Sequence, residues 1–296
     1  MSQKMHDTRR RKQIRRDRLG RGLIALAAGL VLAIMLLIIV DLVAGGASVL
    51  SWEFLTAMPR ERMTAGGILP CIVGTIAVTL VTTLFAIPFG LATAIYLNEY
   101  ARDTWGTRLI RLAIRNLAGV PSIVYGIFGV ALFVSGLSLG TSIISAGLTL
   151  GLLTIPWTIT ASEEALRSVP PAWREASLAL GASRWKTIRS IVLPRAVPGI
   201  ITGGILGITR AAGETAPLLF TGAAFSLPGL PQSVFEPFMA LPYHIYVLAT
   251  QHEKINAVRP LAYGTALVLI GMILALSLVA IIIRARLRKR HGGAGL

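Results

Sequence analysis

Apolar residues occur along this chain in six long runs, each close to 20 residues or longer. That is the length a helix needs to cross the hydrocarbon core of a bilayer. The runs cover residues 22–43, 69–97, 116–137, 140–161, 196–221 and 261–283. They lack the two-residue alternation of a barrel strand, and only helices and closed barrels cross lipid with every backbone group paired. The pattern therefore predicts an all-α membrane protein with six transmembrane helices.

The first run follows an Arg-rich segment, as the apolar core of a signal peptide does. It is about 21 residues long, whereas the apolar region of a signal peptide has about 7–15 residues. We therefore predict a retained first transmembrane helix at 22–43, preceded by a basic segment at 1–22.

Composition agrees with a membrane protein. The chain has 296 residues, of which 54% are hydrophobic and 14% charged, with a mean hydropathy of +0.71. A soluble domain would carry about 25% charged residues.

Lys and Arg are distributed unevenly between the two sets of loops. They number nine in 1–22, four in 98–115, six in 162–195 and five in 284–290, whereas the opposite loops hold only Arg60, Arg62, Lys254 and Arg259. Because positive loops stay on the cytoplasmic side, this bias places both termini there, with a cytoplasmic loop at 162–195 and a basic cytoplasmic tail at 284–296. The same placement beside spans explains the net charge of +16 without nucleic-acid binding, since basic residues bordering spans contact anionic lipid headgroups.

Residue types that carry catalysis or hold metals are scarce. Cys71 is the only cysteine, and the four histidines, His6, His244, His252 and His291, have no ligand spacing. The sequence contains no GxxxxGK[ST] phosphate loop and no supported Ser/His/Asp set. We therefore expect no catalytic site, no metal and no cofactor on this chain.

The cytoplasmic loop contains the run EASLALGASRWKTIRSIVLP from Glu175 to Pro194, and residues in and just before it are typical of helix starts and ends. Pro171 can begin a short helix, Gly181 can end it in a left-handed conformation, and Ser183 can cap a second helix ending before Pro194. Such a projecting helix could dock in a groove of a partner or could lie on the membrane surface, and the residues alone leave both interpretations open.

The spacing of this run resembles the "EAA" loop of permease subunits of ABC importers, which packs against the ATPase subunit. The positions that carry the resemblance are Glu175, Ala176, Gly181, Ile191, Leu193 and Pro194. Ser177 stands where the family usually has alanine, and the two residues are close in size. The resemblance implies the fold of a type I ABC importer permease.

The fifth run contains two charges, Arg210 and Glu214, in an otherwise apolar stretch. A charge at the centre of a spanning helix costs about 2.5–3.5 kcal/mol on insertion scales. At a separation of four residues the two would share a helix face and could pair. They could form a gate or substrate-path pair, or an internal ion pair that fixes helix packing. Gly203 and Gly207 form a small-xxx-small pattern typical of close helix contact.

The stretch RAAGETAPLLFT, from Arg210 to Thr221, resembles the PstA family, permease subunits of phosphate-specific ABC importers. The stretches IPFGLATAIYLNEYA from Ile87 and GVPSIVYGIFG from Gly119 resemble the same family. The resemblance implies that Arg210 and Glu214 act in phosphate passage in a bacterial inner membrane. It implies a PstC-like homologous permease and two PstB-like ATPases that bind ATP and Mg. It also implies a PstS-like binding protein outside. The outer loop 222–260 could fold against the bundle or offer a surface to that protein.

Three other classes share part of this pattern. A permease for another oxyanion, such as sulfate or molybdate, would have the same loop but not GETAPLLF. A secondary transporter or channel would need no ATPase, and a membrane scaffold would have no use for buried charges at Arg210 and Glu214.

Overall fold

The long helices of the structure follow the apolar runs of the sequence. In this computed structural model the backbone is described for residues 2–292, and the side chains for residues 20–286 apart from Arg62. The long helices are α1 (Ser2–Gly46), α3 (Leu69–Ile95), α6 (Ile143–Arg167), α9 (Leu193–Ala212) and α12 (Ile255–Gly292). Each belongs to a helical stretch long and apolar enough to cross a membrane, and a sixth span is formed by a bent pair of helices. The predicted all-α class with six spans is confirmed. The expected tail at 284–296 and the basic segment at 1–22 extend beyond the described side chains.

Short elements connect these helices. They are α2 (Trp52–Thr56), the antiparallel strands β1 (Pro59–Arg60) and β2 (Ala65–Gly66), α4 (Trp105–Leu117), α5 (Ser122–Gly129), α7 (Pro171–Ala179), α8 (Arg184–Thr187), α10 (Ala216–Thr221), α11 (Leu241–Thr250), 3₁₀ turns at Ala47–Val49 and Glu61–Met63, and π-helical turns at Tyr96–Tyr100, Val130–Gly136 and Ile188–Val192.

The third span differs from the run predicted at 116–137. It begins earlier, with α4, and bends by 100° before continuing through α5 to Gly136. The bend follows from Gly119-Val120-Pro121, because proline lacks an N–H and disfavours a helical conformation in the residue before it. Three of the arginines assigned to the loop at 98–115 therefore lie on a helix beside the bundle, Arg108, Arg111 and Arg115.

The fifth span is also not the continuous helix predicted at 196–221. It is helical from Arg184 through the π-helical turn into α9, stops at Ala212 and resumes as α10. Pro217 stands in the first turn of α10, where it supplies no N–H to a continuing helix, and Gly213 favours the interruption by its low helix propensity. The charged residue Glu214 therefore lies in a helix break.

Helices α3, α6 and α9 pack closely through small residues. A methyl group added at Gly203 of α9 would overlap the Cβ of Ala161 on α6. At Gly207 it would come within 2.8 Å of the Cγ2 of Thr154. The expected small-xxx-small contact is confirmed, and it brings the backbones of α6 and α9 together.

The outer loop at 222–260 folds against the bundle. Ala224 N–H donates to the carbonyl of Phe238 at 2.7 Å, and the side chains of Phe238, Met239 and Leu241 are buried. The segment before them leaves apolar side chains exposed, among them Phe225 and Phe235.

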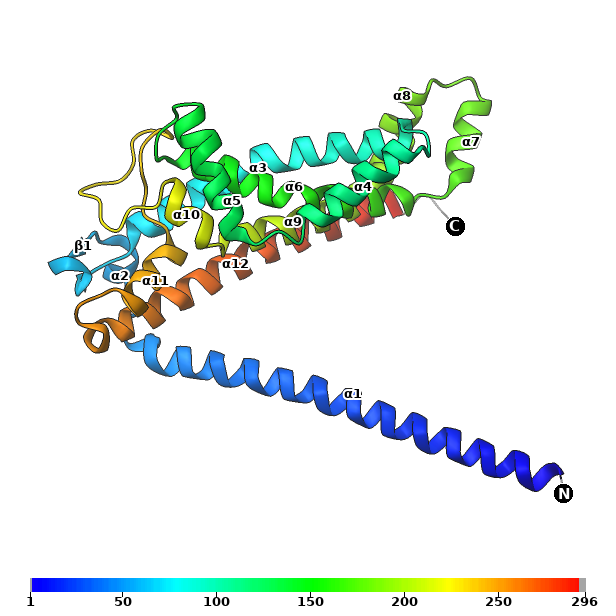
Figure 1. Ribbon diagram of the computed structural model, residues 1–296, viewed down its shortest axis with the longest axis horizontal. Coiled ribbons are helices and arrows are strands. Elements are labelled where there is room, and N and C mark those ends of the chain that lie inside the picture. The colour runs from blue at the N-terminus through cyan, green and yellow to red at the C-terminus, as the bar shows by residue number, and fades with distance from the viewer. Residues whose placement is uncertain (1, 293–296) are drawn as a thin grey trace.

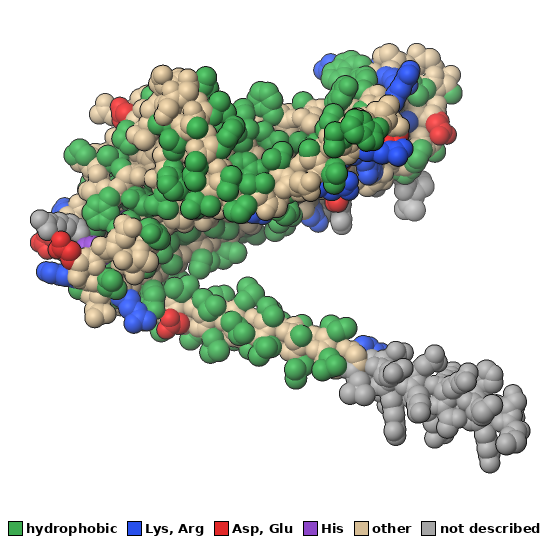
Figure 2. Space-filling view, viewed as in Figure 1, with side chains coloured by type: hydrophobic (Ala, Val, Ile, Leu, Met, Phe, Trp, Pro, Cys, Tyr) green, Lys and Arg blue, Asp and Glu red, His purple; other side chains and the backbone are tan. Residues whose placement is uncertain are grey.

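Helix α1 stands apart from the bundle (Figure 1). It meets α12 at its C-terminal end, where Gly45 and Gly46 lie against Tyr263 and Gly264, and none of its apolar window is buried. Figure 2 shows hydrophobic side chains along α1 and over the flank of the bundle, with Lys and Arg gathered near the end that carries α7 and α8. In Figure 1 the first described residues of α1 and the last described residues of α12 lie toward that same end of the molecule.

A buried histidine in α11 is expected to make the stability of the fold sensitive to acid. His244 is 5% exposed, its Nδ1 lies 3.4 Å from Thr265 Oγ1, and its Nε2 has no hydrogen-bond partner among the described residues. Burial lowers the pKa of His244 from its ordinary 6.5 to about 4. The unfolded chain then takes up a proton that the folded chain rejects, so the free energy of unfolding falls by up to about 3 kcal/mol as pH drops from 6.5 to 4.

Thermal unfolding of the detergent-solubilised chain at pH 7.5, 6 and 5 measures this loss. His244→Gln should flatten the pH dependence, and the control His252→Gln, at a partly buried position, should retain it. An unchanged acid response in His244→Gln would assign the sensitivity to other groups.

Candidate functional site

The loop between α6 and α9 forms a projecting helix, and the residues at its ends are those that the sequence predicted. Pro171 is the first residue of α7, Gly181 has a φ of +82°, and Ser183 Oγ accepts from the N–H of Lys186 at 3.3 Å. All three predictions are confirmed. A side chain at position 181 would be strained by the left-handed backbone conformation, which explains glycine there.

The second short helix does not end before Pro194 as predicted. The chain stays helical from Arg184 to Ala212, with a π-helical turn at Ile188–Val192 directly before Pro194. The π-helical turn changes the hydrogen-bond register where proline can donate no N–H, so the helix continues past it. The residues from Arg184 onward are thereby part of the same continuous helical stretch as the fifth span.

The predicted loop residues divide between two environments. Glu175, Ala176 and Gly181 are exposed, and Leu180 beside them is 89% exposed. Ser177 is instead buried, and its hydroxyl lies 2.9 Å from Thr187 Oγ1, which ties α7 to α8. Ile191, Leu193 and Pro194 are partly buried, with Leu193 packed against a core cluster. Serine in place of the usual alanine thus serves the internal contact.

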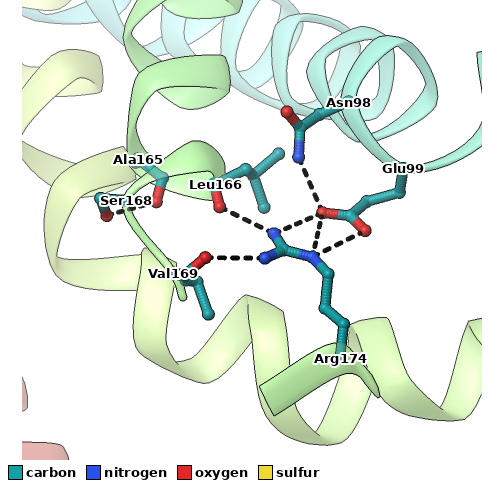
Figure 3. A network of polar contacts seen from close by, with 7 residues as sticks. All are labelled: Asn98, Glu99, Ala165, Leu166, Ser168, Val169 and Arg174. Atoms are coloured by element: carbon teal, nitrogen blue, oxygen red, sulfur yellow. Dashed lines mark hydrogen bonds and ion pairs between the residues drawn. The ribbon is translucent and has the colours of Figure 1, made fainter. Parts of the chain in front are cut away.

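An arginine network anchors α7 to the spans (Figure 3). Arg174 Nη2 lies 2.8 Å from Glu99 Oε1, and the exposed fractions of the two side chains are 20% and 9%. The same guanidinium donates to the carbonyls of Leu166 at 2.8 Å and Val169 at 2.7 Å. Since α6 ends at Arg167, Arg174 adds a donor to carbonyls in and just after the last turn of that helix. One side chain thus links α7 to the ends of α3 and α6.

A second ion pair braces the same region. Arg111 of α4 donates from Nε to Glu163 Oε1 at 3.1 Å and from Nη2 to the carbonyl of Leu97 at 2.6 Å. The cation of Arg195 lies 4.1 Å from the centroid of the Trp173 ring, which holds α7 against the start of α9. The projecting loop is therefore fixed to α3, α6 and α9, and the Arg111 pair ties α4 to α6 beside it.

Glu99 is a residue of this site that the sequence pattern did not predict. It lies 75 residues from Arg174, so no local periodicity connects them. The available signal was a carboxylate directly after a span, at the same predicted membrane side as a basic loop. Opposite charges at those two places are compatible with an ion pair but do not specify which residues form it.

The second predicted pair lies at the break in the fifth span. Arg210 Nε is 3.5 Å from Glu214 Oε1, with side chains 44% and 17% exposed. The two do not share one regular helix face as predicted, because the helix ends at Ala212, yet the turn after it brings them together. Gly213 N–H donates to the Arg210 carbonyl at 3.1 Å, which closes that turn.

Trp157 of α6 completes this site. Its ring centroid lies 4.8 Å from the Arg210 guanidinium carbon, a cation–π contact that the sequence did not reveal. The guanidinium is therefore held in place by a carboxylate and a ring while almost half of the side chain stays accessible. Such an arrangement can offer a positive charge to an anion without leaving that charge unpaired in its absence.

No cluster of His, Cys, Asp and Glu suited to a metal was found within the described part of the chain.

A family model described as "Binding-protein-dependent transport system inner membrane component" matches residues 86–292. "Probable ABC transporter permease protein YqgI" of Bacillus subtilis is 35% identical, with 89% of this chain and 93% of that protein covered. "Phosphate transport system permease protein PstA 1" of Mycobacterium tuberculosis is 41% identical, with coverages of 74% and 71%. Among solved structures, a bacterial ABC transporter involved in the import of the acidic polysaccharide alginate matches with a TM-score of 0.67 at 16% identity, covering 93% of this chain and 98% of that one. At that identity the structural match concerns the fold, which is that of an ABC importer permease.

Proposed function

The chain belongs to the binding-protein-dependent transport system inner membrane components, and from this we propose that it is a permease subunit of an ATP-driven importer of inorganic phosphate. It forms half of the translocation path in a bacterial inner membrane, with both termini in the cytoplasm. The chain itself carries out no chemistry. The hydrolysis of ATP, with its Mg ion, takes place on a separate subunit.

The observation that carries the substrate assignment is the Arg210 site. An arginine whose side chain is 44% exposed, in the last helical turn before a break in the span, is suited to an oxyanion, since its guanidinium can present two N–H groups to two oxygens. Glu214 limits how tightly an anion is held, and passage requires binding weak enough for release. The 41% identity to a protein named as a phosphate permease supports phosphate among the oxyanions.

Coupling to the ATPase uses the exposed face of α7. Glu175 and Ala176 face outward, and Gly181 leaves room at the corner for close approach of another chain. We expect two PstB-like ATPases at this face and at the matching face of a PstC-like permease. ATP-driven closure of the ATPases displaces α7, and the Arg174–Glu99 contact transmits that displacement to α3 and α6.

A PstS-like binding protein is expected at the opposite end of the molecule. The outer segment there offers exposed apolar side chains, Phe225, Leu230, Val234 and Phe235, on a loop whose following residues are buried. An exposed apolar group on a fixed loop is typical of a protein contact.

Uptake by the reconstituted complex tests the substrate. Labelled phosphate should be accumulated in an ATP-dependent way, and unlabelled sulfate or molybdate in excess should not compete. Competition by sulfate or molybdate, with little phosphate accumulation, would replace phosphate by that oxyanion. Accumulation of phosphate without ATP would overturn the importer assignment.

A further inference from the structure

An open groove lies on the fifth span, away from the helix break. It has a volume of about 400 Å³ and is lined by residues of α6, α9 and α12, most of them apolar. Its lining includes Glu164, Ala165, Gly199, Thr202, Leu206 and Arg284. This set is called here the Arg284 groove. It includes neither Arg210, Glu214 and Trp157, which form the Arg210 site, nor any residue of α7.

Arg284 enters this groove from α12. Its Nη1 donates to Thr202 Oγ1 at 3.2 Å across the helix interface, and the side chain is partly buried. Within the described residues no carboxylate lies within 4.0 Å of its guanidinium, and Glu164 lines the groove without an ion pair to it. Arg284 therefore has a hydroxyl partner but no ion pair among the described residues, although the carboxylate of Glu164 lines the same groove.

The contact at Arg284 has the register of an antiparallel helix pair. Thr202 meets Arg284, and a methyl group at Gly213 would lie 3.9 Å from Ile273 Cδ1, so eleven residues along α9 correspond to eleven along α12. Arg284 of α12 thus lies against α9 at the level of Thr202, between Pro194 and the helix break. This placement distinguishes it from Arg286, which is exposed on the same helix.

Thr202, Leu206 and Arg210 follow one another at four-residue intervals and share one face of α9. Leu206 between the other two is 67% exposed. Eight residues of helix separate Thr202 from Arg210, a rise of about 12 Å. Two arginines from different helices therefore reach the same open face of α9 at two depths.

We propose that Arg284 and Thr202 form a second oxyanion-binding station, on the cytoplasmic side of Arg210. The ligand is a tetrahedral oxyanion, which takes N–H donors from the guanidinium in place of Thr202 Oγ1. The Thr202 O–H, which donates to the Pro198 carbonyl at 2.8 Å, turns to the anion when the anion binds. Glu164 at the rim keeps the residence short, as conduction through successive sites requires. This proposal rests on the proposed function and adds a step to it.

A phospholipid headgroup presents the same phosphate chemistry as the free anion, so the test separates the two. The whole complex is reconstituted in phosphatidylcholine vesicles with and without phosphatidylglycerol, and initial phosphate uptake is measured. Arg284→Gln should lower the rate about tenfold in both lipids, the equivalent of one charged hydrogen bond. Arg284→Lys should restore part of the rate, and the control Arg286→Gln should retain all of it. A defect confined to vesicles with phosphatidylglycerol would assign the groove to lipid and overturn the proposal.

Thiol labelling tests occupancy directly and does not require transport. Cys71 is buried and is the only cysteine, so Leu206→Cys introduces one accessible thiol. In an Arg210→Gln background, phosphate should slow modification of that thiol by an anionic reagent, and Arg284→Gln should remove the protection. Absence of phosphate protection in the Arg210→Gln background overturns the second station.

The two proposals fail in different ways. Loss of uptake in Arg210→Gln with normal uptake in Arg284→Gln would overturn the second station alone. Normal uptake in both would overturn the path through α9, and the station with it.

Discussion

Arg210→Gln is expected to lower phosphate uptake by at least about 100-fold while the complex still assembles. The substitution removes the cation offered to the substrate. It also leaves Glu214, 17% exposed, as an unpaired carboxylate at the same place, where it repels an anion. Both effects act on passage, and the small change in shape leaves the packing of α9 intact.

Glu214→Gln should behave differently, which makes the pair informative. Removing the carboxylate frees Arg210 to hold the anion more tightly, so we expect a lower KM together with a lower maximal rate. Arg259 lies near the N-terminal end of α12, so Arg259→Gln serves as a control for the loss of one positive charge outside the Arg210 site. If phosphate uptake by the assembled complex stayed within twofold of the unmodified protein in both Arg210→Gln and Glu214→Gln, this pair would be excluded from the path.

Arg174→Ala is expected to uncouple ATP hydrolysis from transport and to destabilise the chain by about 3–5 kcal/mol. The substitution leaves Glu99, 9% exposed, without its cation, and it removes a donor from each of the carbonyls of Leu166 and Val169. Because α7 keeps its exposed face, the ATPase should still co-purify. Uptake should fall much more than ATP hydrolysis.

An exposed ion pair supplies the matched control. Arg108 and Asp103 form a comparable contact at 2.9 Å with side chains 69% and 71% exposed. Arg108→Ala should cost no more than about 1 kcal/mol, because water screens such a pair. Equal effects of Arg108→Ala and Arg174→Ala on unfolding and uptake would contradict a special role for the Glu99 contact.

Features set by local chain chemistry could be predicted from the sequence. Pro171, Gly181 and Ser183 each act within a few residues of their own position, and α7 begins, ends and turns where they indicated. Long apolar runs predicted the spans for the same reason, since a bilayer imposes a length on every helix.

Features that depend on contacts distant in the sequence could not be predicted in this way. The Glu99–Arg174 pair needs α3 and α7 to meet, and the ring of Trp157 reaches Arg210 only because α6 packs on α9. The two bends had local signals, Pro121 and Pro217, but hydropathy runs continuously through both prolines. Apolar composition alone does not distinguish a straight span from a broken one.

The separation of α1 from the bundle has a consequence for biogenesis. Its contact with α12 lies at Gly45 and Gly46, so the helix can enter the bilayer as soon as it leaves the ribosome, before any other span exists. We therefore expect α1 to insert first and to join the bundle only after Tyr263 and Gly264 of the last helix have been synthesised.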